Sequence, residues 1–232
     1  MKTILKFSVM MLFSISLLFT TGCEKAEALL GLSNTDIIAG LKEALNVGTG
    51  NAVVKLGAAD GYYLDRLVKI PFPPEAENAK NTLIQLGFES TVNDFVLKLN
   101  RAAEDAAPEA KQIFLDAIVG ITIQDGNTIL RGDSIEATRY LQTKTSNQLA
   151  NLFKPKIQAS LEEVGAQQLW SDLTTQYNSL PLVQPINTDL AAYTTDRALS
   201  GMFVKVGQEE TKIRKDPAAR VSDILKKVFG NP

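Results

Sequence analysis

Two acidic residues near the C-terminus have the pattern of groups that could carry chemistry. Glu209 and Glu210 each lie three or four positions from Val206 and Ile213, so on a helix both carboxylates fall beside an apolar stripe. A carboxylate near a core needs a partner or becomes neutral. Paired carboxylates can bind a ligand or a metal ion, and they can hydrolyse a substrate when their separation suits that reaction.

The same two carboxylates also have a structural interpretation. Arg214 follows Glu210 by four positions, and Lys205 precedes Glu209 by four, which is the spacing of ion pairs on one helix. We favour this interpretation because such pairs are common on helices, whereas perturbed acidic groups mark functional sites only some of the time.

A second polar row contains Asn100, Arg101 and Glu104, next to an apolar stripe with Phe95 and Leu99. Neighbouring alanines would let other helices approach closely, so both faces of this helix are expected to be covered. Arg101 could then orient a bound anion, although a buried structural hub is the favoured interpretation. We expect the two rows to join in one polar network that serves a ligand or the scaffold.

Composition excludes several other chemistries. The chain has no histidine and one cysteine, which removes imidazole as base or ligand, disulfides and Cys-x-x-Cys zinc sites. The sequence from Cys23 onward has no Ser-x-x-Lys pair, no nucleophile elbow and no phosphate-binding loop with its lysine. Asp125, Asn127, Asp133 and Glu136 stand at positions 1, 3, 9 and 12 of a possible calcium-binding loop. However, Ile129 occupies position 5, where a ligand is needed, and Leu130 occupies the position of the turn glycine. We therefore expect no catalytic residue, metal or cofactor.

The N-terminus predicts export and lipidation. Lys2 and Lys6 precede an apolar run from Phe7 to Phe19, which matches a signal peptide and is short for a membrane span. The following Thr20-Thr21-Gly22-Cys23 is similar to a bacterial lipobox, although Thr20 stands where leucine is usual. Ordinary secretion with a free cysteine and an uncleaved anchor helix remain alternatives.

This interpretation divides the chain into a signal peptide (1–22), the lipidated Cys23 with its tether (23–32) and a folded domain (33–232). Loss of the two lysines with the signal leaves 22 basic against 26 acidic residues, a net charge of −4. A mildly acidic domain lacks the basic surface that nucleic-acid binding requires. The membrane is thus an expected partner through the anchor, and nucleic acid is not.

The folded part is predicted to be all-α, a single irregular domain of about nine helices. Ser33 and Asp36 give a capping pattern before the first apolar helical repeat, and the longest candidate helix covers Asp189–Arg214. Pro155 is expected to punctuate the later helices, and a short strand is possible near Leu67–Ile70. No segment has convincing alternation of period two, and β-branched residues are scattered.

Five segments together resemble an uncharacterised family of bacterial envelope lipoproteins that is catalogued only as a domain of unknown function. They are Asp36–Leu45, Leu99–Glu104, Ile123–Asp125, Gln208–Arg214 and Asp223–Gly230. The resemblance covers nearly the whole mature chain. It implies an α-helical domain behind a lipobox-type signal, and it supplies no catalytic residues.

The predicted protein is a membrane-anchored lipoprotein of the bacterial envelope, facing the periplasm. The missing nucleophile and base sets favour a non-enzymatic binding domain for a small ligand or an envelope partner. A carboxylate-dependent envelope enzyme is the alternative, and it requires Glu209 and Glu210 to line an open cleft. A structural or adhesion role would instead need a large exposed apolar patch.

Overall fold

The computed structural model describes residues 32–186 and 188–230, and this part of the chain is all-α, as predicted. The predicted signal peptide, Cys23 and nearly all of the tether lie outside the described residues. The α-helices are α2 (Asn34–Gly57), α3 (Glu77–Gln85), α4 (Glu89–Ala106), α5 (Ala110–Val119), α6 (Ile123–Arg131), α7 (Glu136–Glu163), α8 (Ala166–Asn178), α9 (Leu190–Lys215) and α10 (Asp223–Phe229). Short 3-10 helices cover Pro74–Ala76, Ala107–Glu109 and Pro217–Ala219.

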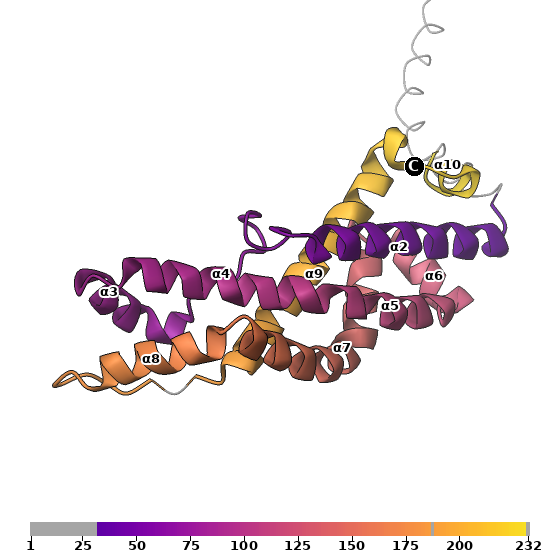
Figure 1. Ribbon diagram of the computed structural model, residues 1–232. Coiled ribbons are helices and arrows are strands. Elements are labelled where there is room, and N and C mark those ends of the chain that lie inside the picture. Colours follow the sequence, from indigo (N-terminus) through magenta and orange to yellow (C-terminus); the bar gives the residue numbers. More distant parts are fainter. Residues whose placement is uncertain (1–31, 187, 231–232) are drawn as a thin grey trace, which may run out of the picture.

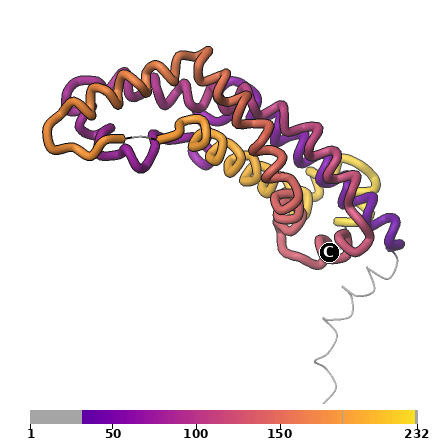
Figure 2. Tube along the Cα trace, turned by 90° about the horizontal axis from the view of Figure 1, so that it is seen from below, coloured from indigo at the N-terminus to yellow at the C-terminus, as the bar shows by residue number. Residues whose placement is uncertain are grey.

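The helices form an elongated body with two distinct ends (Figures 1 and 2). The start of α2 and the turn between α5 and α6 lie at one end, whereas α3 and α8 lie at the other. The most extensive helix contacts join α9 to α7 and to α2, so α9 runs through the middle of the packing. The start of α2, at Asn34, therefore lies at the end opposite α3 and α8.

Local sequence signals set where several helices begin. The Ser33 side chain accepts a hydrogen bond from the Asp36 N–H (3.1 Å), and the Asp36 carboxylate accepts one from the Ser33 N–H (3.2 Å), so the predicted capping box is confirmed. Thr122 and Asp125 make the same box at the start of α6. Asp189 caps α9 through the Ala192 N–H (2.9 Å). Each cap uses residues within one turn, which is why the sequence reveals it.

An aromatic cluster fixes the end of the body that contains α8. The Phe95 ring of α4 stacks on the Trp170 ring of α8 with centroids 5.2 Å apart, and Phe72 contacts both rings at 5.2 and 5.5 Å. All three residues are buried. Such pairs contribute about 0.5–1.5 kcal/mol each beyond the apolar area that they bury. The cluster therefore ties the chain just before α3 to both α4 and α8.

Two predictions about local structure are wrong. Pro155 does not end a helix but lies inside α7, which at 28 residues is longer than the 26-residue α9. Packing against α9 and α4 keeps α7 continuous, although Pro155 has no N–H to donate to the Asn151 carbonyl. The segment Leu67–Ile70 is not a strand within the described chain, because no second strand pairs with it.

No single helix within residues 32–186 and 188–230 has the length and apolar composition to cross a bilayer. The pair Glu89–Val119 and Ile123–Arg131 meets that criterion only when taken together, and it is bent by 106°.

A close approach between α2 and α10 makes Gly40 sensitive to substitution. A Cβ atom at Gly40 would lie 2.5 Å from Val228 Cγ2 and 2.8 Å from Val228 Cβ. We expect Gly40→Ala to lower the free energy of unfolding by about 1–3 kcal/mol, since α10 must shift. Gly50, in the same helix, has nothing within 4 Å of such a Cβ. Gly50→Ala should instead raise stability by up to about 1 kcal/mol through helix propensity. Urea denaturation of both variants measures this, and equal signs would contradict it.

Candidate functional site

Glu210 is buried in α9 and acts as the cap of a different helix. Its Oε1 accepts a hydrogen bond from the Ala137 N–H (3.1 Å), and its Oε2 accepts bonds from the N–H (2.8 Å) and Oγ1 (2.7 Å) of Thr138. These amides belong to the first turn of α7, whose own N-cap residue, Ile135, offers no side-chain hydrogen bond. A negative carboxylate at a helix N-terminus satisfies open amides and opposes the positive end of the helix dipole.

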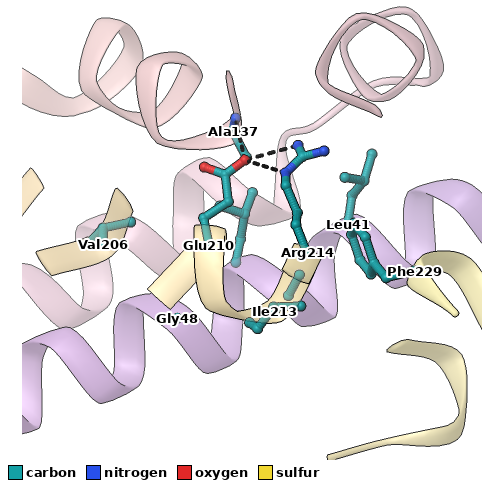
Figure 3. A pocket seen from close by; sticks show the side chains of 10 residues that line it. Leu41, Gly48, Ala137, Val206, Glu210, Ile213, Arg214 and Phe229 are labelled. Carbon is teal, nitrogen blue, oxygen red and sulfur yellow. Dashed lines mark hydrogen bonds and ion pairs between the residues drawn. The ribbon is translucent and has the colours of Figure 1, made fainter. Parts of the chain in front are cut away.

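Arg214 supplies the opposite charge, as the spacing predicts (Figure 3). Its Nε and Nη2 lie 3.0 and 2.9 Å from Glu210 Oε1, and Nη2 also donates to the Ile129 carbonyl at the end of α6 (3.0 Å). Both side chains are largely buried. Glu210 thus receives hydrogen bonds from α7 and from Arg214, and the pair joins α6, α7 and α9 at one point.

The second predicted pair, between Glu209 and Lys205, is not present. Glu209 Oε2 accepts a hydrogen bond from Asn51 Nδ2 of α2 (3.0 Å). Lys205 is buried and makes its ion pair with Asp65, which lies outside α9, and it donates to Gln208 Oε1 at 3.0 Å. A buried ammonium group needs a carboxylate within ion-pair distance. The fold places the carboxylate of Asp65, and not that of Glu209, at that distance from Lys205.

The Asn100 side chain makes the hydrogen bonds to the Ile70 backbone that a neighbouring strand would otherwise make. Its Oδ1 accepts a hydrogen bond from the Ile70 N–H (2.8 Å), and its Nδ2 donates to the carbonyls of Ile70 (2.8 Å) and Val96 (2.7 Å). The carboxamide is fully buried, and it satisfies both backbone groups of a buried residue that lies outside the helices.

Glu104 and Arg101 hold the other side of the same connection. Glu104 Oε1 accepts hydrogen bonds from the Tyr62 and Tyr63 N–H groups (3.1 and 3.2 Å), and its Oε2 pairs with Arg101 Nη1 at 2.6 Å. Arg101 Nη2 lies 2.7 Å from Asp60 Oδ1. Asp60 has φ of 66°, a conformation that costs energy outside glycine and that this pairing helps to hold.

These contacts define two networks. The first, the Glu210 network, contains Glu210 and Arg214, which contact the ends of α6 and α7. The second, the loop network, contains Asn100, Arg101, Glu104 and Lys205, which contact residues 58–70 after α2. Among the described residues, no hydrogen bond or ion pair joins the two, so they do not form one combined site.

Sequence reasoning missed the loop partners Asp60, Tyr62, Asp65 and Ile70. Asp60, Tyr62 and Ile70 lie 41, 42 and 30 positions from their partners on α4, and Asp65 lies 140 positions from Lys205. No periodic pattern relates residues so far apart. Helical spacing indicates Lys205 only as an ion-pair partner for Glu209. Its position on the buried face of α9, next to Val206, was the signal that it needed a distant counter-charge.

The space around the Glu210 network is too small for a substrate. The cavity there measures about 10 Å³, room for about one water molecule. Leu41, Val206, Ile213 and Phe229 are among the residues that line it (Figure 3). Within the described residues, no group of three or more histidine, cysteine or acidic side chains could hold a metal ion.

A larger hollow lies where α7 passes the start of α9. It measures about 390 Å³, is open to solvent, and is lined by apolar residues together with Lys154, Asp196 and two amide residues. Pro155 also lines it, at the point where the Asn151 carbonyl lacks its helical donor. Thr195 is in contact with the hollow and has a buried hydroxyl without a hydrogen-bond partner.

The loop network predicts a specific response to acid. Burial opposes ionisation of Asp65, but the hydrogen bond from Lys205 and the N–H of Leu67 outweigh it and hold the pKa of Asp65 below its usual value. Ionised Asp65 therefore stabilises the fold at neutral pH, and this contribution is lost as the pH falls below about 4. In Lys205→Met, we expect the pKa of Asp65 to rise in an NMR titration and the acid-dependent part of stability to become smaller.

Lys212 is an exposed lysine of the same helix, so Lys212→Met is the matched control. This control should leave the pKa of Asp65 unchanged. If both variants moved it equally, the ion pair with Lys205 would not be the cause.

Comparison with known proteins identifies a family. A family model described as "Protein of unknown function (DUF4197)" matches residues 31–230, a span that includes every described residue. No curated protein and no solved structure matches the chain. The match agrees with the resemblance to a domain of unknown function that the five sequence segments carried.

Proposed function

The chain belongs to the DUF4197 family of proteins of unknown function, and from that premise we propose that it is a lipid-anchored protein of the bacterial envelope. Its helical domain is proposed to bind an envelope partner or a small ligand without catalysing a reaction. The observation that carries the anchor is Thr20-Thr21-Gly22-Cys23 directly after a basic and apolar leader. The cysteine stands ten positions before the Ser33 cap, so the anchor would be tethered to the domain at the start of α2.

The two buried glutamates support binding over catalysis. A general acid or base must exchange a proton with a substrate, which requires an atom that the substrate can reach. Glu210 is occupied by α7 and Arg214, and Glu104 by two backbone amides and Arg101. Neither therefore favours the carboxylate-dependent enzyme, because both side chains already hold the scaffold together.

A hollow at the surface offers a place for a small ligand within the described part of the molecule. The hollow between α7 and α9, of about 390 Å³, falls in the range of small-molecule sites. The side chains of Asn151, Lys154, Gln158 and Asp196 line it and can offer hydrogen bonds to a polar compound. This hollow, and not the surroundings of Glu210, is where we place the binding role for a small ligand.

Mass spectrometry of the native product tests the anchor. The full chain is expressed in a bacterium and recovered from the membrane fraction, and its N-terminal peptide is expected to begin at Cys23 with a thioether-linked diacylglycerol. Cys23→Ser should abolish this mass. An unmodified Cys23 thiol on a chain that is not membrane-associated would overturn the proposal.

A further inference from the structure

The connection between α2 and the 3-10 helix at Pro74 is unusually long and has an apolar tip. It spans residues 58–73, sixteen in number, and stands out from the helical body after α2 (Figure 1). Loops longer than about 12–15 residues without regular structure are usually functional. Leu64 and Leu67 in this loop are 70% and 67% exposed, which is a costly position for two leucines that face only water.

Among the described residues, the charged side chains of this loop that form no ion pair are positive. Both acidic residues of the loop are paired, Asp60 with Arg101 and Asp65 with Lys205. Arg66 is exposed and has no ion pair within the described residues, and Lys69 lies 4.0 Å from the centre of the Tyr63 ring. The tip is therefore apolar and basic, although the mature chain as a whole is acidic.

The loop network fixes this tip in place before any partner arrives. Glu104 binds the amides of Tyr62 and Tyr63, and Asn100 binds both backbone groups of Ile70, on either side of Leu64 and Leu67. A backbone that is already ordered loses little conformational entropy on binding. The buried polar groups on α4 and α9 thus have a clear consequence, which is a rigid presentation of two leucines and a free arginine.

We propose that this tip docks onto the anionic bilayer to which the chain is anchored, a step that rests on the proposed lipid anchor. Leucine side chains beside basic groups suit the headgroup boundary of an anionic membrane. A protruding loop also fits a flat, deformable surface better than it fits a pocket.

The geometry allows the anchor and the tip to reach the same bilayer. The 24 residues of α2 separate the tip from the Ser33 end by roughly 36 Å, at 1.5 Å per residue. The ten residues from Cys23 to Ser33 can span up to about 33–36 Å. The domain would then lie with α2 along the membrane, held at one end by lipid and at the other by the tip.

Site-specific labelling tests the docking. In the acylated chain, Cys23 carries lipid, so Leu64→Cys supplies the only free thiol for an environment-sensitive fluorophore. In vesicles with phosphatidylglycerol, this label should shift to shorter wavelength and be quenched by nitroxides on the acyl chains. Leu182→Cys is the matched control, because Leu182 is fully exposed in the different loop between α8 and α9. Equal quenching at positions 64 and 182 would overturn the proposal.

A second measurement separates docking from anchoring. A Cys23→Ser chain without the predicted signal peptide (1–22) cannot be acylated, and it should still co-sediment with phosphatidylglycerol vesicles more than with phosphatidylcholine vesicles. Arg66→Gln should weaken this partitioning about fivefold, as expected for one basic group at an anionic surface. If Arg66→Gln has no effect on this partitioning, docking on lipid is overturned. Docking on lipid is also overturned if the fluorophore at position 64 is shielded from water in native membranes but not in vesicles that contain no other protein. The anchor is judged independently by the mass of the N-terminal peptide.

Discussion

Glu210→Ala is expected to lower the free energy of unfolding by about 3–5 kcal/mol, the usual cost of removing one partner of a buried charge pair. The substitution leaves the amides of Ala137 and Thr138 without an acceptor at the start of α7. It also leaves the Arg214 guanidinium, which is 15% exposed, without its counter-charge. Urea denaturation at neutral pH, followed by circular dichroism, measures the change.

Glu209→Ala is the matched control for this experiment. Glu209 is the preceding residue of the same helix, and its one hydrogen bond, to Asn51, lies at the surface. We expect a change within about 0.5 kcal/mol. If Glu210→Ala proved as mild as Glu209→Ala, Glu210 would not cap α7 in solution, and a functional role for its carboxylate would regain support.

Glu104→Ala should cost a similar amount, about 3–5 kcal/mol, but with a local signature. The variant removes the acceptor for the Tyr62 and Tyr63 amides and leaves Arg101 paired with Asp60 alone. Hydrogen exchange at the Tyr62 and Tyr63 amides should therefore accelerate more than exchange in α7, because the loop is released before the body unfolds.

Asp94→Ala controls for the loss of a carboxylate from α4. Asp94 is exposed and lies 3.9 Å from Lys98, so this variant should change stability by about 0.5 kcal/mol or less. Uniform acceleration of exchange in Glu104→Ala, without a preference for the loop, would contradict a role for Glu104 in holding residues 58–70.

The sequence predicted several features that depend on neighbours within about one turn. The cap at Ser33 uses an acceptor and an amide three positions apart. The Glu210–Arg214 pair follows from the four-residue repeat of a helix. Helical periodicity and the lack of period-two alternation gave the all-α class for the same reason, since side-chain direction in a helix is fixed by local geometry.

The sequence could not predict the tertiary partners. Lys205 pairs with Asp65 across 140 positions, and Glu104 binds amides 41 and 42 positions earlier. Whether a carboxylate staples its own helix, caps another or fixes a loop depends on which groups the packed helices place within hydrogen-bond distance. Pro155 shows the same limit, because the packing of α7 outweighs a local helix-breaking preference. Local geometry therefore determined the helices, and only the tertiary structure decided what the buried charges of those helices do.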